Sequence, residues 1–262
     1  MLLALLFPMK NSTTKSKIEA VLRIILPIIF WCLVWEILAG LIGHSFILPG
    51  IGKTLKALGS LITQKDFYLS VFLTLIRVII GLILGIIVGT LLAVLCYRVK
   101  PINYLFSPLI TIIKSTPVAS FIVVLWIMMS ADALSVFIAF LMVMPIIWQN
   151  VTDGYLAVDK GLNEVCEVYN FSPSKRFRLL IFPTLKRYLI PGIITASGLA
   201  WKAEIAAEII AYTKHSIGQG INDAKSELNT PSVFAWTVVI ILFSIVLEKL
   251  TKYVLRRFSS ES

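Results

Sequence analysis

Residues 70–97 read SVFLTLIRVIIGLILGIIVGTLLAVLCY, an apolar run in which Arg77 is the single charged residue. About 20 residues of helix are enough to cross the hydrocarbon core of a bilayer, so this run is long enough to span one. Its glycines, Gly81, Gly85 and Gly89, recur at intervals of four and therefore share one helical face. Another helix can approach closely there, because glycine has no side chain. The run predicts a membrane-spanning helix with a glycine packing face.

The whole composition agrees with a membrane protein. Hydrophobic residues make up 58% of the 262 residues and charged residues 15%, against about 45–50% and about 25% in soluble domains. We expect an all-α polytopic membrane protein with six transmembrane helices. The expected spans lie at about 21–43, 70–97, 105–129, 132–152, 189–213 and 232–255. Residues 1–20 are then an N-terminal segment, and residues 21–262 form one membrane domain that includes a polar loop at 153–188.

The basic residues indicate an orientation. The net charge is +10, and most of the basic residues lie between the apolar runs. With the N-terminus inside, the cytoplasmic segments hold Lys10, Lys15, Lys17, Arg98, Lys100, Lys160, Lys175, Arg176, Arg178, Lys186, Arg187, Lys252, Arg256 and Arg257. The opposite face holds only Lys53, Lys56, Lys65, Lys214 and Lys225. This asymmetry follows the positive-inside rule. We therefore expect an inner-membrane protein with both termini and the loop 153–188 on the cytoplasmic side. No nucleic-acid-binding signature accompanies the basic residues, so we expect membrane lipid and no nucleic acid as a partner.

The third expected span is interrupted by Lys114-Ser-Thr-Pro117. Pro117 lacks a backbone donor and disfavours helical geometry at Thr116, which predicts a break in the helix. Irregular backbone inside a membrane is tolerated against protein or a water-filled cavity. Two interpretations stay open: a break that lines a translocation path, or a simple turn at the start of the helix.

The loop between the fourth and fifth spans has a helical pattern of its own. Residues 161–171 read GLNEVCEVYNF, and helical spacing places Leu162, Val165, Val168 and Tyr169 on one side, with Glu164 and Glu167 on the other. The stop signals that follow are Asn170, Ser172 and Pro173. Ser174 to Phe182 then predicts a second, basic helix that ends at Pro183. A helix, a turn and a helix should project from the membrane.

This loop resembles the signature loop of binding-protein-dependent ABC permeases, which reads E-A-A, three residues, G, nine or ten residues, then I-x-L-P. The matching residues here are Glu164-Val-Cys166, Asn170 and Ile181-Phe-Pro183. In that family the loop forms a coupling helix that docks into a groove of the ATPase subunit. The resemblance implies an ATPase-coupling role for Gly161, Leu162, Glu164, Val165, Cys166, Tyr169, Asn170 and Pro183. A purely structural cytoplasmic hairpin is the alternative.

The departures from this pattern are small in physical terms. Val165 and Cys166 replace the two alanines, Asn170 replaces the glycine, and Phe182 replaces the leucine. Asparagine tolerates the left-handed backbone conformation that a sharp helix end requires better than most residues other than glycine.

Further matches, in chain order, resemble the nitrate, sulfonate, taurine and bicarbonate branch of the family. They are Leu48-Pro49, Thr74-Leu-Ile-Arg77 with the three glycines, Lys114, Pro117, Ala119, Trp126, Ala200-Trp201, Ala206-Ala-Glu208 and Gly218-Gln-Gly220. Phe121 and Met128 stand where that branch usually has proline and glycine. The resemblance implies a type I importer permease that works as two copies, or with a similar partner chain. It also implies two cytoplasmic ATPase subunits, an extracytoplasmic binding protein, and a small anion or a vitamin precursor as substrate.

Four charged residues fall inside expected spans: Arg77, Lys202, Glu204 and Glu208. An ionisable group in a membrane costs about 3 kcal/mol or more and tends to face the interior of the helix bundle. Together with Lys114 and Pro117, these residues are candidates for a translocation path or gate. Arg77 and Glu208 lie at similar depth, so we expect them to pair. A structural ion pair that fixes helix register is the alternative to a substrate contact.

No pattern in the sequence predicts a catalytic site, a metal site or a cofactor. Cys32, Cys96 and Cys166 are far apart and have no metal-ligand spacing. Gly52-Lys53-Thr54 resembles the end of a phosphate-binding loop, but Ile47 stands where its first glycine is required. Motifs of intramembrane enzymes, such as H-E-x-x-H, are missing from the sequence. ATP hydrolysis is therefore expected on a separate subunit, and the rival function is an ATPase-independent channel or an ion-coupled carrier.

Overall fold

The computed structural model describes residues 14–259, and in this range every regular element is a helix. Residues 1–13 of the expected N-terminal segment lie outside the described residues, and residues 14–20 already belong to the first helix. The chain divides into two compact units, one made of residues up to 63 with 224–235, the other of 64–223 with the residues from 236 onward. The expected single membrane domain at 21–262 thus contains the boundary between these units.

The helices of the first unit are α1 (Thr14–Ile42) and α2 (Ile51–Ile62). The second unit contains α3 (Lys65–Arg98), α4 (Lys100–Ser115), α5 (Val118–Trp126), α6 (Ala131–Leu156), α7 (Lys160–Val168), α8 (Pro173–Arg176), a π-helical turn (Phe177–Ile181) and α9 (Phe182–Ala211). Helices α10 (Ile217–Ser226) and α11 (Thr230–Ser259) contribute residues to both units.

Five helical segments of the described chain are long and apolar enough to cross a membrane, and a sixth span results if α4 and α5 are counted together. These two helices meet at an angle of 102°. The break predicted at Pro117, within the span expected at 105–129, is therefore confirmed. Thr116 has an extended backbone (φ −82°, ψ 133°), as expected for the residue before a proline.

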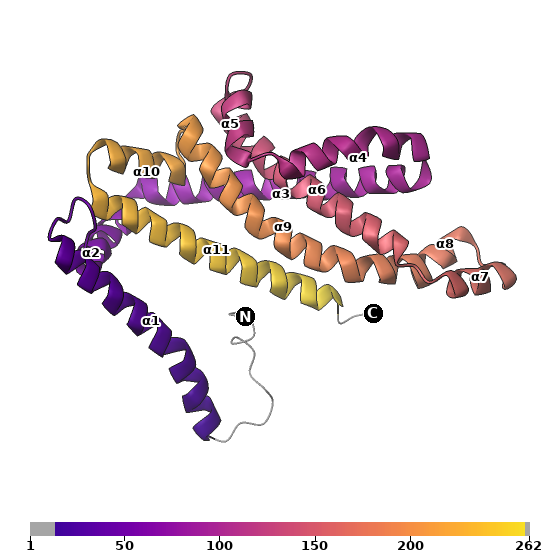
Figure 1. Ribbon diagram of the computed structural model, residues 1–262, viewed down its shortest axis with the longest axis horizontal. Coiled ribbons are helices and arrows are strands. Elements are labelled where there is room, and N and C mark those ends of the chain that lie inside the picture. The colour runs from indigo at the N-terminus through magenta and orange to yellow at the C-terminus, as the bar shows by residue number, and fades with distance from the viewer. Residues whose placement is uncertain (1–13, 260–262) are drawn as a thin grey trace. The chain divides into compact units, whose positions relative to one another are not determined.

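The centre of the second unit is the packing of α3 and α9 against α6, which Figure 1 shows as long helices lying together. The glycine face of α3 lies on α6. A β-carbon added at Gly81 would lie 2.5 Å from the Ala139 β-carbon, and one added at Gly85 would lie 2.5 Å from the Val143 β-carbon. A β-carbon added at Gly89 would lie 2.7 Å from the carbonyl oxygen of Met144. The predicted glycine packing face is confirmed.

In the first unit, α1 is followed by the short helix α2, which was not predicted from the sequence. The Glu36 carboxylate accepts a hydrogen bond from the Ile51 amide at 2.8 Å, at the start of α2. A carboxylate at this position accepts a hydrogen bond from a free amide and interacts favourably with the positive end of the helix dipole. The Trp35 Nε1–H donates to the Pro49 carbonyl oxygen at 3.0 Å. These two bonds fix the direction in which the chain leaves α1.

The basic helix predicted from Ser174 does not end at Pro183. Instead, the chain stays helical from Pro173 through the π-helical turn and on to Ala211. Pro183 directly follows the π-helical turn and Phe182, at a point where the regular i→i−4 hydrogen-bond ladder is already interrupted, so the amide that proline lacks removes no regular α-helical bond. The proline is therefore compatible with continued helix, and the extra residue of the π-helical turn precedes it.

Candidate functional site

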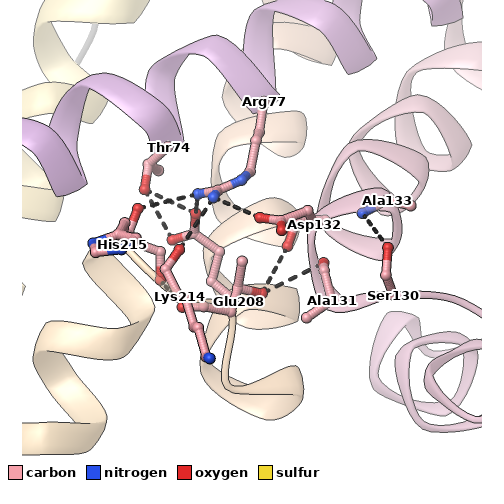
Figure 2. Close-up of polar contacts among 12 residues, drawn as sticks. Thr74, Arg77, Ser130, Ala131, Asp132, Ala133, Glu208, Lys214 and His215 are labelled. Carbon is pink, nitrogen blue, oxygen red and sulfur yellow. Dashed lines mark hydrogen bonds and ion pairs between the residues drawn. The ribbon is translucent and has the colours of Figure 1, made fainter.

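Arg77, buried on α3, is the centre of a polar cluster in the second unit (Figure 2). Its Nη1 donates to Glu208 Oε1 on α9 at 3.0 Å. Its Nη2 donates to Asp132 Oδ1 in the first turn of α6 at 2.7 Å. The guanidinium also donates to the carbonyl oxygens of Lys214 and His215, at 3.1 and 3.4 Å. One side chain thereby joins α3, α6, α9 and the turn that follows α9, and the expected pairing of Arg77 with Glu208 is confirmed.

Glu208 is fully buried and has several hydrogen-bond donors around its carboxylate. Thr74 Oγ1 donates to both of its oxygens, at 2.8 and 3.0 Å. The Gly218 amide, at the start of α10, donates to Oε2 at 3.1 Å. A carboxylate in the last turn of a helix opposes the helix dipole. The arginine, the hydroxyl and the free amide of α10 compensate for that unfavourable position.

The turn between α9 and α10 is held in an unusual backbone conformation. Tyr212 and His215 both have positive φ angles, 54° and 47°, a region that non-glycine residues seldom occupy. This conformation directs the carbonyl oxygens of residues 214 and 215 toward Arg77. It also lets α10 begin beside Glu208. The arginine therefore holds the turn as well as the helices.

Glu204 and Lys202 lie on different faces of α9. Glu204 is 0% exposed, and neither of its carboxylate oxygens has a hydrogen-bond partner within the described part of the chain. Lys202 is exposed. The structure therefore places Glu204 beside the Arg77 cluster in the interior, and Lys202 outside it.

Lys114 and Pro117 are not part of this cluster. Lys114 is exposed in the last turn of α4, and its Nζ is 3.5 Å from Gln149 Oε1 on α6. Gln149 follows Asp132 by 17 residues on α6, so these two residues are about 25 Å apart at a rise of about 1.5 Å per residue. Lys114 therefore lies far from the Arg77 cluster. Pro117 is exposed at the bend between α4 and α5. Of the candidate path residues, only Arg77, Glu204 and Glu208 are therefore brought together.

The predicted helical hairpin is present at the end of α9 opposite α10 (Figure 1). Asp159 is the N-cap of helix α7, and its carboxylate accepts a hydrogen bond from the Leu162 amide at 2.8 Å. Asn170, the residue after the C-cap Tyr169, has a left-handed φ of 50°. The Phe171 amide donates to the Cys166 carbonyl oxygen, and the Asn170 amide donates to that of Glu167. This pattern is a Schellman motif, so the expected left-handed asparagine is confirmed.

Two further contacts hold α8 against the end of α7. Arg176 Nη1 lies 3.4 Å from Glu167 Oε1. The Lys175 ammonium lies 4.1 Å from the centre of the Phe171 ring, a cation–π arrangement. The hairpin is therefore stabilised by its own side chains.

The residues of α7 divide into one buried and several exposed side chains. Cys166 is buried, whereas Leu162, Val165 and Tyr169 are 55%, 47% and 72% exposed. Glu164 and Gly161 are also exposed. An apolar stripe on a short polar hairpin is unfavourable in water and is a common feature of interaction surfaces.

Known proteins resemble this chain in sequence and in fold. Residues 81–260 match the family described as binding-protein-dependent transport system inner membrane component. The chain belongs to this family. The match contains the glycine face of α3, the α7 hairpin and Glu208, whereas Thr74 and Arg77 precede its first residue.

Among relatives of this family member are two cyanobacterial proteins. The bicarbonate transport system permease protein CmpB of Synechococcus elongatus is 24% identical over 158 residues, covering 60% of this chain and 57% of that protein. The nitrate import permease protein NrtB of Synechocystis is 26% identical over 211 residues, covering 77% of this chain and 76% of that protein. The alignment with the bicarbonate protein thus spans little more than half of its length.

A crystal structure of an amino acid ABC transporter with histidines has the same fold. Its TM-score is 0.60 at 18% identity, and the match covers 73% of this chain and 91% of that one. Together with the apolar helices, the family places this chain in the inner membrane as a multi-pass protein.

Sequence analysis missed several groups around Arg77. Asp132 was expected only as the first residue of a span, although an acidic residue in the first turn of a helix is a recognisable signal. Thr74 precedes Arg77 by three residues and so shares its helical face. The two carbonyl oxygens of the turn carried no signal, because their orientation depends on left-handed residues in the folded chain.

Proposed function

We propose that this chain forms, with a second copy of itself, the translocation path of an ATP-driven importer for a small anion. ATP is hydrolysed on two separate cytoplasmic ATPase subunits, and an extracytoplasmic binding protein delivers the substrate. The observation that carries this proposal is the exposed apolar stripe of α7 on a hairpin that matches the family's coupling loop. A second, similar permease chain could take the place of the second copy.

Helix α7 is suited to transmit movement from an ATPase subunit. Its apolar stripe, Leu162, Val165 and Tyr169, is exposed on the isolated chain and would be buried in a groove of the partner. The capped ends and the Arg176–Glu167 pair make the hairpin a stiff element. Because α8, the π-helical turn and α9 are continuous, a movement of the hairpin would be transmitted along α9 into the membrane.

The proposal of a second copy is supported by two residues on the outside of the isolated chain. Lys202 is exposed on α9, a helix that crosses the membrane, and an ammonium group facing lipid there is costly. Pro117 is exposed at the broken α4–α5 pair, and irregular backbone facing lipid is equally unfavourable. Both positions are accounted for if each of them faces an aqueous path between two copies.

The cations on this surface favour an anionic substrate. Lys202 and Lys114 are both exposed, whereas the acidic residues Glu204 and Glu208 are fully buried. The names of the cyanobacterial relatives mention bicarbonate and nitrate, which are small anions. We infer that Lys114, Pro117 and Lys202 line the path, and that the Arg77 and Glu208 pair is part of the gate structure that supports it.

The orientation follows from the distribution of lysine and arginine. The α7 hairpin and both termini are assigned to the cytoplasm, and the Arg77 cluster and α10 to the opposite side. In this orientation the coupling hairpin faces the ATPase subunits. The turn held by Arg77 faces the binding protein.

Reconstitution tests this function. Proteoliposomes containing the chain, its ATPase subunit and its binding protein should accumulate radiolabelled nitrate or bicarbonate only when ATP is hydrolysed. Omission of the ATPase subunit, or a non-hydrolysable ATP analogue, should abolish accumulation. Equal flux without the ATPase subunit would support a channel or an ion-coupled carrier and would refute the proposal.

A further inference from the structure

Glu204 is a buried acidic residue that the proposed path does not use. It precedes Glu208 by four residues on α9, so the two side chains share one helical face. It is 0% exposed, and both of its oxygens lack a hydrogen-bond partner among residues 23–257 whose side chains are described. The charged groups that act on it are Glu208 and Arg77. An ionised carboxylate in this setting would be shielded from bulk solvent and would have no donor among the described groups.

Arg77, the cation that acts on Glu204, does not donate to it through its terminal nitrogens. A guanidinium has five N–H donors, two on each terminal nitrogen and one on Nε. Nη1 of Arg77 donates to Glu208 and the His215 carbonyl oxygen, and Nη2 donates to Asp132 and the Lys214 carbonyl oxygen. All four terminal donors are therefore used by other groups.

The remaining charged groups on the packed helices do not compensate for a second buried negative charge. On α3 the charge that faces this region is Arg77, and on α6 it is Asp132, which is itself acidic. Lys202 on α9 is exposed on another face of that helix. With Glu204 ionised, one arginine would face three carboxylates. With Glu204 neutral, the buried Arg77 and Glu208 charges cancel and Asp132 remains at the exposed rim, its side chain 70% exposed.

The carboxylate of Glu208 has room for one more donor. An ionised carboxylate offers about four lone-pair sites. Three donor protons approach that of Glu208: one from Arg77, one from the Gly218 amide, and the single hydroxyl proton of Thr74, which lies within reach of both oxygens but can fully occupy only one site. A protonated neighbour could supply the fourth.

From these contacts we propose that Glu204 is a neutral carboxylic acid whose O–H donates a hydrogen bond to the Glu208 carboxylate. The site binds a proton inside the membrane and keeps the Arg77 and Glu208 pair electrically balanced. Glu204 is thus a positioning residue for Glu208, and the bound proton is part of the folded structure.

Infrared spectroscopy of the purified, membrane-reconstituted protein tests this assignment at neutral pH. The carbonyl stretch of a protonated carboxylic acid should be present in the wild-type protein and absent in Glu204→Gln. Asp132→Asn is the matched control and should keep the band, since Asp132 is an exposed carboxylate. Absence of the band from the wild-type protein, or its persistence in Glu204→Gln, would overturn the proposal.

Substitutions give a second test that does not depend on the spectrum. Glutamine has the shape of glutamic acid and keeps a donor, so Glu204→Gln should leave thermal stability unchanged and uptake within about twofold. Glu204→Leu removes the donor and should lower both more than Glu204→Gln does. Equal losses in the two variants would show that a donor at this position has no effect, and failure of Glu204→Gln to fold would show that a negative charge is needed; either result would refute the neutral acid.

Discussion

Arg77 on α3 and Glu208 on α9 form an ion pair with 3.0 Å between Nη1 and Oε1. The Arg77 side chain is 10% exposed and that of Glu208 is 0% exposed. Within a membrane-spanning unit, such a pair leaves each partner dependent on the other. Removal of one would leave an uncompensated buried charge.

This pair predicts non-additive substitutions. Arg77→Ala and Glu208→Ala should each lower the free energy of unfolding by about 3 kcal/mol, because each leaves a buried charge unpaired. The double variant should lose less than the sum of the two, with a coupling energy of about 1–3 kcal/mol. Thermal unfolding of the four purified proteins in one detergent measures this cycle. Strict additivity would show that the two residues are independent.

Asp132→Asn is the control for this cycle. Arg77 also pairs with Asp132, at 2.7 Å, but the Asp132 side chain is 70% exposed. Exposed pairs contribute less than about 1 kcal/mol because solvent screens them. Asp132→Asn should therefore change stability far less than Glu208→Ala. An equal loss in both variants would contradict the ranking of the two contacts by burial.

The glycine face of α3 predicts a loss of stability on minimal enlargement. A β-carbon at Gly85 would lie 2.5 Å from the Val143 β-carbon and 3.2 Å from the Phe140 carbonyl oxygen. Gly85→Ala should lower the free energy of unfolding by about 1–3 kcal/mol, because α3 and α6 must separate. Gly59→Ala in α2 is the matched control, since no described atom lies within 4 Å of its added β-carbon. The control should raise helix stability by roughly 0.5–1 kcal/mol.

The left-handed backbone at Asn170 predicts an order of substitutions at the end of α7. Asn170→Gly should keep ATP-driven uptake, because glycine adopts a φ of 50° without strain. Asn170→Pro should abolish uptake, because proline fixes φ near about −65° and removes an amide that donates to Glu167. Both variants should still insert into the membrane. Uptake by Asn170→Pro at the wild-type rate would exclude a coupling role for the hairpin end.

Cysteine labelling tests the orientation. In a cysteine-free background, Lys160→Cys places a thiol at the start of α7. It should react with a membrane-impermeant maleimide only in inside-out vesicles. Lys214→Cys, on the turn held by Arg77, should show the opposite accessibility. Labelling of position 160 in intact cells would reverse the assigned orientation.

Much of the fold could be predicted because apolar length and helical periodicity are local properties. Residues 70–97 alone indicated a spanning helix and its glycine face, and the stop at Asn170 indicated the end of α7. Helix α2 was not predicted because it is only 12 residues long, which is too short to span a membrane. In addition, no strong capping residue precedes it. Pro183 was misread as a stop because proline is compatible with both the end of one helix and the first turn of another.

The candidate site was predictable only in part. Charge and depth were enough to pair Arg77 with Glu208, since a membrane leaves few alternatives for a buried charge. The burial of Glu204 and the exposure of Lys202 depend on how α9 is rotated against α3 and α6. The role of the Lys214 and His215 carbonyl oxygens depends on backbone angles of the turn. Both are properties of the assembled helices.

The most direct test of the central claim is uptake by a Glu164→Lys variant. Glu164 is an exposed residue of α7, so the substitution should leave the permease folded and inserted while reversing a charge on the hairpin proposed to dock into the ATPase subunit. ATP-driven uptake in proteoliposomes should then be abolished, and Glu164→Gln should retain more of it. Wild-type uptake by an equal amount of inserted Glu164→Lys protein would contradict a coupling role for α7.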